Sequence, residues 1–146
     1  MKLTTKGEYA ARAMLSLSLR HGEGIITIQD LAEKEKIPLK YLEQILLTLR
    51  KAGLLKSRRG VKGGYTLARP PSQITLGEVI RVMEGEFYPD IPSRRGGEDP
   101  YPALTEVWMD VREAVSQILD KVTLEQLCNR AREIRLRRAK SYIYHI

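Results

Sequence analysis

Apolar and polar positions alternate along this chain with two different periods, and the clearest helical period lies at residues 38–53. Its apolar residues recur at intervals of three and four, at Leu42, Ile45, Leu46 and Leu49. This spacing is typical of an amphipathic helix that packs with one face and leaves the other in solvent. Pro38 suits the first helical position, and Gly53 suits the left-handed residue that follows a helix. The apolar spacing, the start signal at Pro38 and the stop signal at Gly53 therefore all predict the same helix.

After Gly53 the period changes to that of strands. Residues 54–57 and 65–67 are short strand-like runs, and the glycines of the turn between them permit positive φ angles. No Asp or Glu occurs between Glu43 and Glu78, whereas seven cations do: Arg50, Lys51, Lys56, Arg58, Arg59, Lys62 and Arg69. Cations without counter-ions indicate a phosphate-binding surface. The alternative is a solvated basic loop that keeps the chain soluble.

A first helix is predicted near the amino terminus. Thr5 and Glu8 have the spacing of a capping box, so this largely buried helix should run to about His21. Its amino end combines free N–H groups with Lys6, which suits a phosphate. We expect His21 to be an ordinary residue at the carboxyl end of the helix rather than a ligand or a base.

A second helix follows closely. Residues 25–27 form a short strand candidate, and Thr27 should then cap a helix that ends near Lys36. Two helices joined this tightly, the second with an exposed polar face, match the helix-turn-helix pattern. With the hairpin that comes next, residues 1–84 are predicted to form a winged-helix domain.

The carboxyl-terminal part begins with a loop at residues 85–102, after a short helix that Thr75 and Glu78 cap and that ends near Gly85. From Ala103 a helix carries an apolar stripe at intervals of three and four, namely Leu104, Val107, Trp108, Val111, Val115, Ile118 and Leu119. A stripe this long is expected to pack on a second copy of the chain. The alternative is that it folds back on its own winged helix.

Thr123 is predicted to cap a last helix, which is strongly basic. Its cations are Arg130, Arg132, Arg135, Arg137, Arg138 and Lys140. They indicate either a solvated helix end or a second surface for nucleic acid or an acidic partner. Residues 142–146 alternate like a strand, which we expect to pair with an edge of this chain or of another.

The charge is unevenly distributed, and this favours a nucleic-acid face. Of the net charge of +7, residues 1–83 hold 15 Lys and Arg against 7 Asp and Glu, whereas residues 84–146 hold 10 against 11. A general solubilising charge has no reason to segregate in this way. The single cysteine, Cys128, excludes an intramolecular disulfide and leaves no cysteine cluster for structural zinc or an all-cysteine iron–sulfur site. With neither a signal peptide nor a membrane span in the pattern, we expect a cytoplasmic protein.

An enzyme is not predicted. The candidate groups His21, His145 and Cys128 have no spacing that would bring nucleophile, base and orienting acid together. Cys128 is expected to be a small buried apolar residue, with a redox-sensing thiol as the alternative.

Four motifs in fixed order resemble the Rrf-two family of bacterial transcription regulators. They are residues 2–10 (KLTTKGEYA), 41–46 (YLEQIL), 49–54 (LRKAGL) and 59–68 (RGVKGGYTLA). The likeness continues at 74–76, 83–85, Trp108 and 122–124. It implies a mostly α fold with a small β wing, in which winged-helix domains form a homodimer through a long carboxyl-terminal helix. Residues 103–146 would then be the dimerisation helix, the last helix and the tail.

The resemblance also implies a binding surface for double-stranded DNA with an inverted-repeat operator. Tyr41, Glu43 and Gln44 would meet base edges or the backbone. Gln44 is chemically suited to adenine and Glu43 to the amino group of cytosine. Arg59 and the turn from Gly60 to Gly64 would lie at the minor groove. The full predicted set is Lys6, Lys40, Tyr41, Glu43, Gln44, Arg50, Arg58, Arg59, Gly60, Lys62, Gly63, Gly64 and Tyr65.

The chain departs from the iron–sulfur members of that family. Those members carry three cysteines before the long helix, whereas residues 85–107 contain neither Cys nor His. No cofactor is therefore expected. The loop and the aromatic ending resemble the CymR-type repressors of cysteine metabolism, which lack the cluster and answer to a cysteine-biosynthetic enzyme. The alternatives are a winged helix used for protein interaction and a redox-sensing regulator acting through Cys128.

Overall fold

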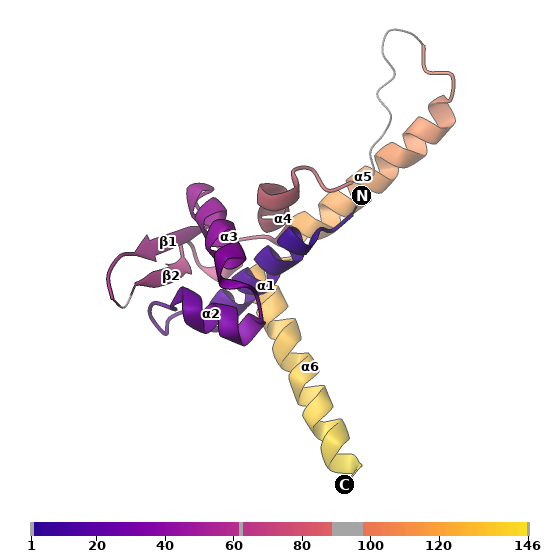
Figure 1. Cartoon of the computed structure of the whole chain (residues 1–146). Helices are drawn as coiled ribbons and strands as arrows, with labels where there is room; N and C mark the ends of the chain where they lie inside the picture. The colour runs from indigo at the N-terminus through magenta and orange to yellow at the C-terminus, as the bar shows by residue number, and fades with distance from the viewer. Residues whose placement is uncertain (1, 62, 89–97, 146) are drawn as a thin grey trace.

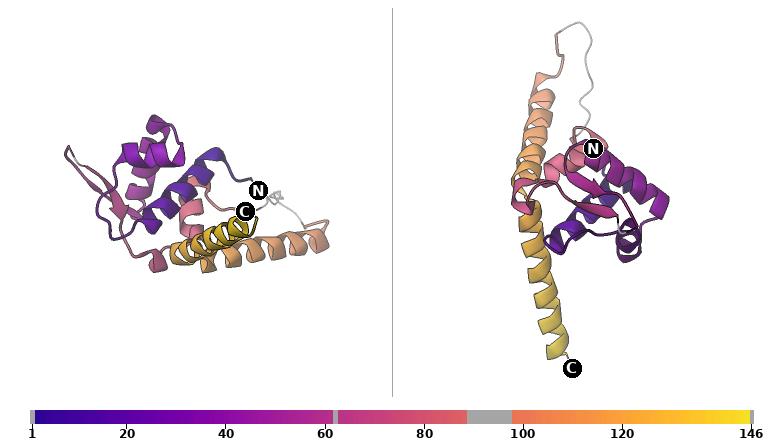
Figure 2. Two further views of the ribbon diagram at one scale, coloured as in Figure 1. Left: turned by 90° about the horizontal axis from the view of Figure 1, so that it is seen from below. Right: turned by 90° about the vertical axis from the view of Figure 1, so that its left-hand side faces the viewer.

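The computed structural model describes residues 2–61, 63–88 and 98–145. A winged helix forms the body, and two long helices that meet at a marked bend form a bent rod at its side (Figures 1 and 2). The elements in order are α1 (Thr5–Leu19), α2 (Ile28–Glu35), α3 (Leu39–Lys51), β1 (Leu55–Arg58), β2 (Gly64–Leu67), the 3₁₀ turn η1 (Pro71–Gln73), α4 (Leu76–Glu84), α5 (Pro102–Lys121) and α6 (Leu124–Tyr144). The predicted mostly α fold with a small β wing is confirmed.

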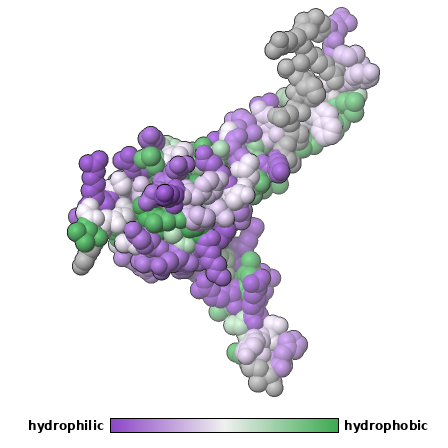
Figure 3. All heavy atoms as spheres, in the orientation of Figure 1, coloured by the Kyte–Doolittle hydropathy of each residue, from purple (hydrophilic) through white to green (hydrophobic). Residues whose placement is uncertain are grey.

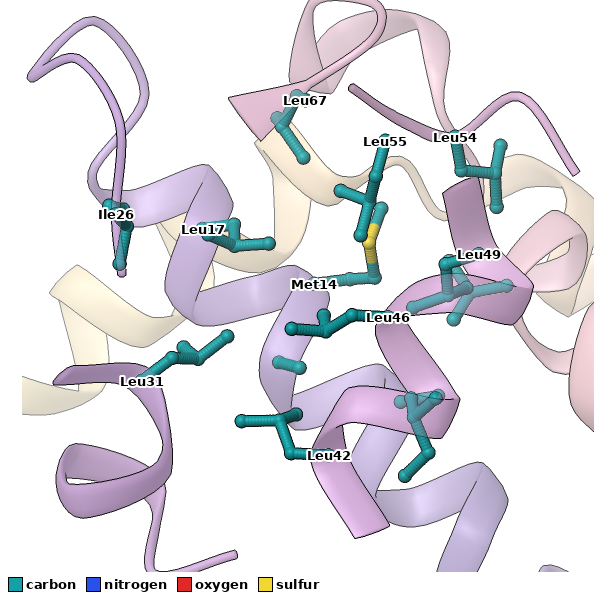
Figure 4. Packing of buried hydrophobic residues seen from close by; sticks show 14 of the residues in the cluster. Met14, Leu17, Ile26, Leu31, Leu42, Leu46, Leu49, Leu54, Leu55 and Leu67 are labelled. Carbon is teal, nitrogen blue, oxygen red and sulfur yellow. The ribbon is translucent and has the colours of Figure 1, made fainter. Parts of the chain in front are cut away.

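The core lies between α1, α3 and the hairpin. Met14 of α1 is fully buried against the predicted stripe of α3, while Leu54, Leu55 and Leu67 close the core from the hairpin side (Figure 4). The buried residues of α3 are Leu42, Ile45, Leu46 and Leu49. Burial of such a side chain contributes roughly 1.5–3 kcal/mol, so this stripe anchors α3 to the body.

Most helix starts are where the side-chain spacing placed them. The Thr27 hydroxyl accepts from the Asp30 N–H at 3.1 Å, and Thr75 and Glu78 form a complete capping box. Thr123 forms a second capping box at the start of α6. At the end of α3, Gly53 has φ +83°, the left-handed conformation that glycine adopts without steric cost.

The predicted cap of α1 was wrong, and the helix is slightly shorter than expected. Thr4, not Thr5, is the capping residue, because its backbone is extended and its hydroxyl accepts from the Gly7 N–H at 3.2 Å. The helix ends at Leu19 rather than at His21.

Two strand predictions were also wrong. Residues 25–27 contribute one isolated bridge, Ile26 to Tyr65, because Thr27 already caps α2. At the carboxyl end α6 continues to Tyr144, so residues 142–144 are helical, while Ile146 lies outside the described residues. An isolated strand has unpaired backbone groups, whereas a continued helix satisfies them within the segment.

The rod is attached to the body near the α5–α6 junction. The Leu76 N–H donates to the Val122 carbonyl at 2.8 Å, and the Leu124 N–H donates to the Ile74 carbonyl at 2.9 Å. Arg81 of α4 binds Asp120 of α5 through two hydrogen bonds of 2.5 and 3.0 Å, which lower the pKa of that carboxyl. No residue of α5 is buried. Both ends of the rod project beyond the winged helix (Figure 1).

The helices of the described residues were compared with the requirements of a membrane span. None of the helices in the described ranges combines the length and the apolar character that a bilayer span requires.

Candidate nucleic-acid interface

The exposed face of α3 carries the side chains that sequence analysis assigned to base contact. Lys40, Tyr41, Glu43 and Gln44 are exposed within the first two turns, opposite the buried stripe. They can form hydrogen bonds with a partner while the buried stripe keeps α3 packed in the core.

The amino end of α3 is held by contacts that sequence analysis missed. The ring of Tyr41 meets the ring of Tyr9 edge-on, with centroids 5.7 Å apart and planes at 80°. The Arg12 guanidinium lies 5.3 Å from the centre of the Tyr9 ring. Arg12 also donates to the Glu35 carbonyl and lies 3.9 Å from the Glu35 carboxylate. These contacts fix α3 relative to both α1 and α2.

The wing extends beyond the body as a two-stranded antiparallel hairpin. Leu55 pairs with Leu67 and Arg58 pairs with Gly64, so Arg58 stands at the last pair before the turn. Arg58 and Arg59 are exposed, and Val61 at the tip is fully exposed. Lys62, also predicted to bind DNA, lies outside the described residues.

The predicted wing glycines allow close backbone approach. Gly64 is buried, and a Cβ atom there would lie 2.1 Å from the Ile26 carbonyl oxygen. A Cβ atom at Gly63 would lie 2.4 Å from the Arg58 carbonyl oxygen. Gly60 has φ +127° and accepts the turn hydrogen bond from Gly63 at 2.9 Å. These residues therefore shape the wing on which the arginines are displayed.

A groove of about 450 Å³ separates the wing from the helix-turn-helix. Its walls are Thr27, Ile28 and Gln29 at the start of α2, Leu47 and Arg50 of α3, and wing residues that include Arg58, Arg59 and Tyr65. Three guanidinium groups and the amino end of α2 thus line one concave surface. Such a surface can bind a row of phosphates.

The cations of this surface form no ion pair with a carboxylate of the described residues. Within the described ranges, the ion pairs of arginine involve Arg12, Arg20, Arg69 and Arg81, and none involves Lys40, Arg50, Arg58 or Arg59. The expectation that Arg69 lacks a counter-ion was wrong, because it lies 3.1 Å from the Glu78 carboxylate. Within the described residues, the cations at the groove and at the start of α3 therefore have no acidic partner.

Lys6 is exposed in the first turn of α1, one turn before Tyr9, which contacts Tyr41. The amino ends of α1 and α3 therefore lie near each other. Glu84 of α4 accepts from the Thr4 N–H at 3.1 Å and also binds the Thr4 hydroxyl. The signal for this missed contact is Gly7, where a Cβ atom would lie 2.2 Å from the Glu84 carboxylate.

Residues 3–130 match the family described as Rrf2, iron-dependent transcriptional regulator. The chain belongs to the Rrf2 family. It is 43% identical to the regulator CymR of Bacillus subtilis over 88% of this chain and 91% of the relative. It is 39% identical to the regulator IscR of Serratia proteamaculans over 88% and 80%.

Solved structures of family members have the same architecture. That of B. subtilis CymR has a TM-score of 0.79 at 41% identity and covers 88% of this chain and 97% of that one. That of T. potens IscR has a TM-score of 0.75 at 38% identity, with 92% and 90% covered. This Rrf2 chain is therefore a DNA-binding transcriptional regulator of the helix-turn-helix type and not an enzyme.

The family description mentions iron, but the residues of this Rrf2 chain do not fit a cysteine-held cluster. Such clusters take up to four cysteine thiolates, and the sequence contains one cysteine and two histidines. Cys128 is buried at the start of α6, where burial raises the pKa of its thiol. Within the described ranges, no three His, Cys, Asp or Glu side chains are grouped to hold a metal ion.

Proposed function

We propose that this chain is a homodimeric repressor that binds an inverted-repeat operator and works without an iron–sulfur cluster. The observation that carries the DNA-binding part is the groove beside α3, whose arginines have no acidic partner within the described ranges. A winged helix that served only to bind a protein would not need such a set of cations. Phosphate contacts, in contrast, depend on it.

Sequence would be read by the exposed face of α3. Gln44 can form two hydrogen bonds with adenine, and Glu43 can accept from the amino group of cytosine. Arg58 and Arg59 would bring the wing to the neighbouring backbone or minor groove. Lys6, Lys40 and Arg50 would bind phosphates on either side of α3.

A dimer is supported by the apolar stripe of α5. Leu104 and Val107 are each 54% exposed, Trp108 is 43% exposed and Ile118 is 66% exposed, although all four are large hydrophobic residues. Val111, Val115 and Leu119 of the same stripe are half-exposed. The winged helix of the same chain leaves this surface open, so a second α5 related by a dyad is the partner that fits. Residues 1–84 would then bind DNA, and residues 103–146 would carry the dimer contact.

The regulated genes are proposed from the relatives. The B. subtilis structure is described as that of the global cysteine regulator of that organism. From this likeness we propose targets in sulfur and cysteine metabolism, with a cysteine-biosynthetic enzyme as co-regulator.

The experiment that tests DNA binding compares Arg59→Ala with Lys121→Ala. Arg59 is at the wing, whereas Lys121 is an exposed cation at the end of α5. We expect Arg59→Ala to weaken binding to every duplex sequence and to lower the salt exponent by about one per chain, hence about two per dimer. Lys121→Ala should bind like the wild type. Equal salt exponents in all three proteins would contradict the proposed surface.

A further inference from the structure

The basic segment of α6 is not explained by the function proposed above. The family match ends at residue 130, yet α6 continues as a helix to Tyr144. We call residues 130–144 the α6 extension. From residue 131 onward the chain has five Lys and Arg against a single Glu. The extension therefore adds concentrated positive charge beyond the part of the chain that matches the family.

Every cation of the extension is available for a partner. All are exposed, and no carboxylate within the described ranges forms an ion pair with any of them. Arg132 forms a hydrogen bond of 3.4 Å with the Asn129 side chain. Figure 3 shows mostly hydrophilic side chains along α6 below the body. The six cations are Arg130, Arg132, Arg135, Arg137, Arg138 and Lys140.

The arrangement of these cations favours one class of partner. With about 100° of rotation per residue, the spacing along the extension directs them to all sides of the helix. A helix that lies on a membrane would collect its cations on one face. A helix in a groove of duplex DNA lies between two phosphate backbones, so cations on several sides find partners. Five of the six are arginines, whose guanidinium groups can bind phosphate through two hydrogen bonds.

The direction of α6 separates the extension from the operator surface. In the views of Figures 1 and 2, α6 runs away from both α3 and the wing. The extension therefore points away from the surface that α3 and the wing would present to the operator.

We propose that the α6 extension binds a second DNA duplex, independently of sequence, while α3 and the wing hold the operator. This inference rests on the proposed function. The regulator would thereby hold two segments of DNA together.

The test uses the full-length protein on an immobilised operator of roughly 20 base pairs, short enough to hold one dimer. After unbound protein is washed away, a fluorescent duplex of random sequence is added and the captured fluorescence is measured at several salt concentrations. The test variant is Arg135→Gln with Arg138→Gln. The matched control is Lys34→Gln with Lys121→Gln, which removes the same charge from exposed positions in α2 and α5.

We expect the wild type and the control to capture the second duplex. The test variant should capture at least about tenfold less at low salt, with the salt exponent lowered by about two per helix engaged. Its operator affinity should stay within about twofold of the wild type, because α3 and the wing are unchanged.

Four results would overturn the proposal. They are absence of capture by the wild type, undiminished capture by the test variant, an equal loss in the control, and displacement of the captured duplex by polyglutamate as readily as by unlabelled duplex at equal charge. The last result would assign the extension to an acidic protein partner. Failure of the wild type to stay on the operator would instead contradict the proposed function.

Discussion

Gln44 and Glu43 are adjacent on the exposed face of α3. Within the described part of the chain, neither side chain contributes to the core or to an ion pair. Their side chains point away from the stripe that holds α3 in the core. Substitution at either position should therefore change recognition without changing the fold.

Gln44→Ala is expected to relax the preference at one base pair in each half-site. The cost should be about 1–3 kcal/mol per site, because an adenine would lose its two hydrogen bonds. Binding to a library of operator variants and to random duplex checks this. Equal losses on operator and random DNA would show that Gln44 contributes no base contact.

Cys128 should react slowly with thiol reagents. It is 3% exposed, and burial raises its pKa, so the thiol stays protonated at neutral pH and forms thiolate only as the pH rises above the ordinary cysteine range. In the same chain, a thiol introduced by Ser141→Cys on the exposed part of α6 should be alkylated on the order of tenfold faster or more. Urea should remove the difference. Equal rates in the folded protein would favour the redox-sensing alternative.

At the scale of elements, the position of the DNA-facing helix is set by several short-range contacts. Tyr9 and Arg12 of α1 connect α2 to the start of α3. On the other side, the bridge between Ile26 and Tyr65 ties the wing to the segment before α2. Both α3 and the wing, which line the groove, are therefore held in place by contacts with the rest of the domain. A groove that is already formed favours binding of DNA without rearrangement of the protein.

Gly64→Ala is expected to loosen the wing. The new methyl group would collide with the Ile26 carbonyl, so β2 must move away and lose the bridge. The free energy of unfolding should fall by about 1–3 kcal/mol in urea titrations. Ser57→Ala, at an exposed position of the partner strand, should change it by less than about 0.5 kcal/mol. Unchanged stability of Gly64→Ala would mean that the close approach is not maintained in solution.

At the scale of the whole molecule, the rod of α5 and α6 leaves apolar side chains in solvent. A helix of 20 residues with no buried side chain is unusual for an isolated chain, since helical stability comes mainly from packing an apolar face. A second copy along α5 would cover it and place two α3 helices on one DNA duplex.

Val111→Glu with Val115→Glu should abolish dimers and high-affinity operator binding while leaving the winged helix folded. Like charges would face each other across the proposed contact without partners. Ser116→Glu with Gln117→Glu adds the same charge to α5 outside the stripe and should remain dimeric. Sedimentation and circular dichroism check both variants. A monomeric wild type at micromolar concentration, or a dimeric Val111/Val115 variant, would contradict the architecture.

The sequence by itself determined the helix period, most of the capping residues and the winged-helix order of elements. These features depend on residues within one or two turns, such as Thr75 with Glu78 or the stripe from Leu42 to Leu49. The ordered motifs also pointed to the correct family. Local signals sufficed because local hydrogen bonds and side-chain periodicity carry them.

Three features were decided only by the tertiary structure. They are the cations that lack an acidic partner, the close contacts that require glycine, and the secondary structure of the carboxyl-terminal residues. Arg69 meets Glu78, Glu84 reaches the start of α1, and Gly64 lies against Ile26. Tyr142, Ile143 and Tyr144 lie in α6 and pair with no strand in the described ranges. Each of these outcomes depends on a contact with a residue from another helix or strand. The spacing of residues along the chain does not show which residues of different elements will meet.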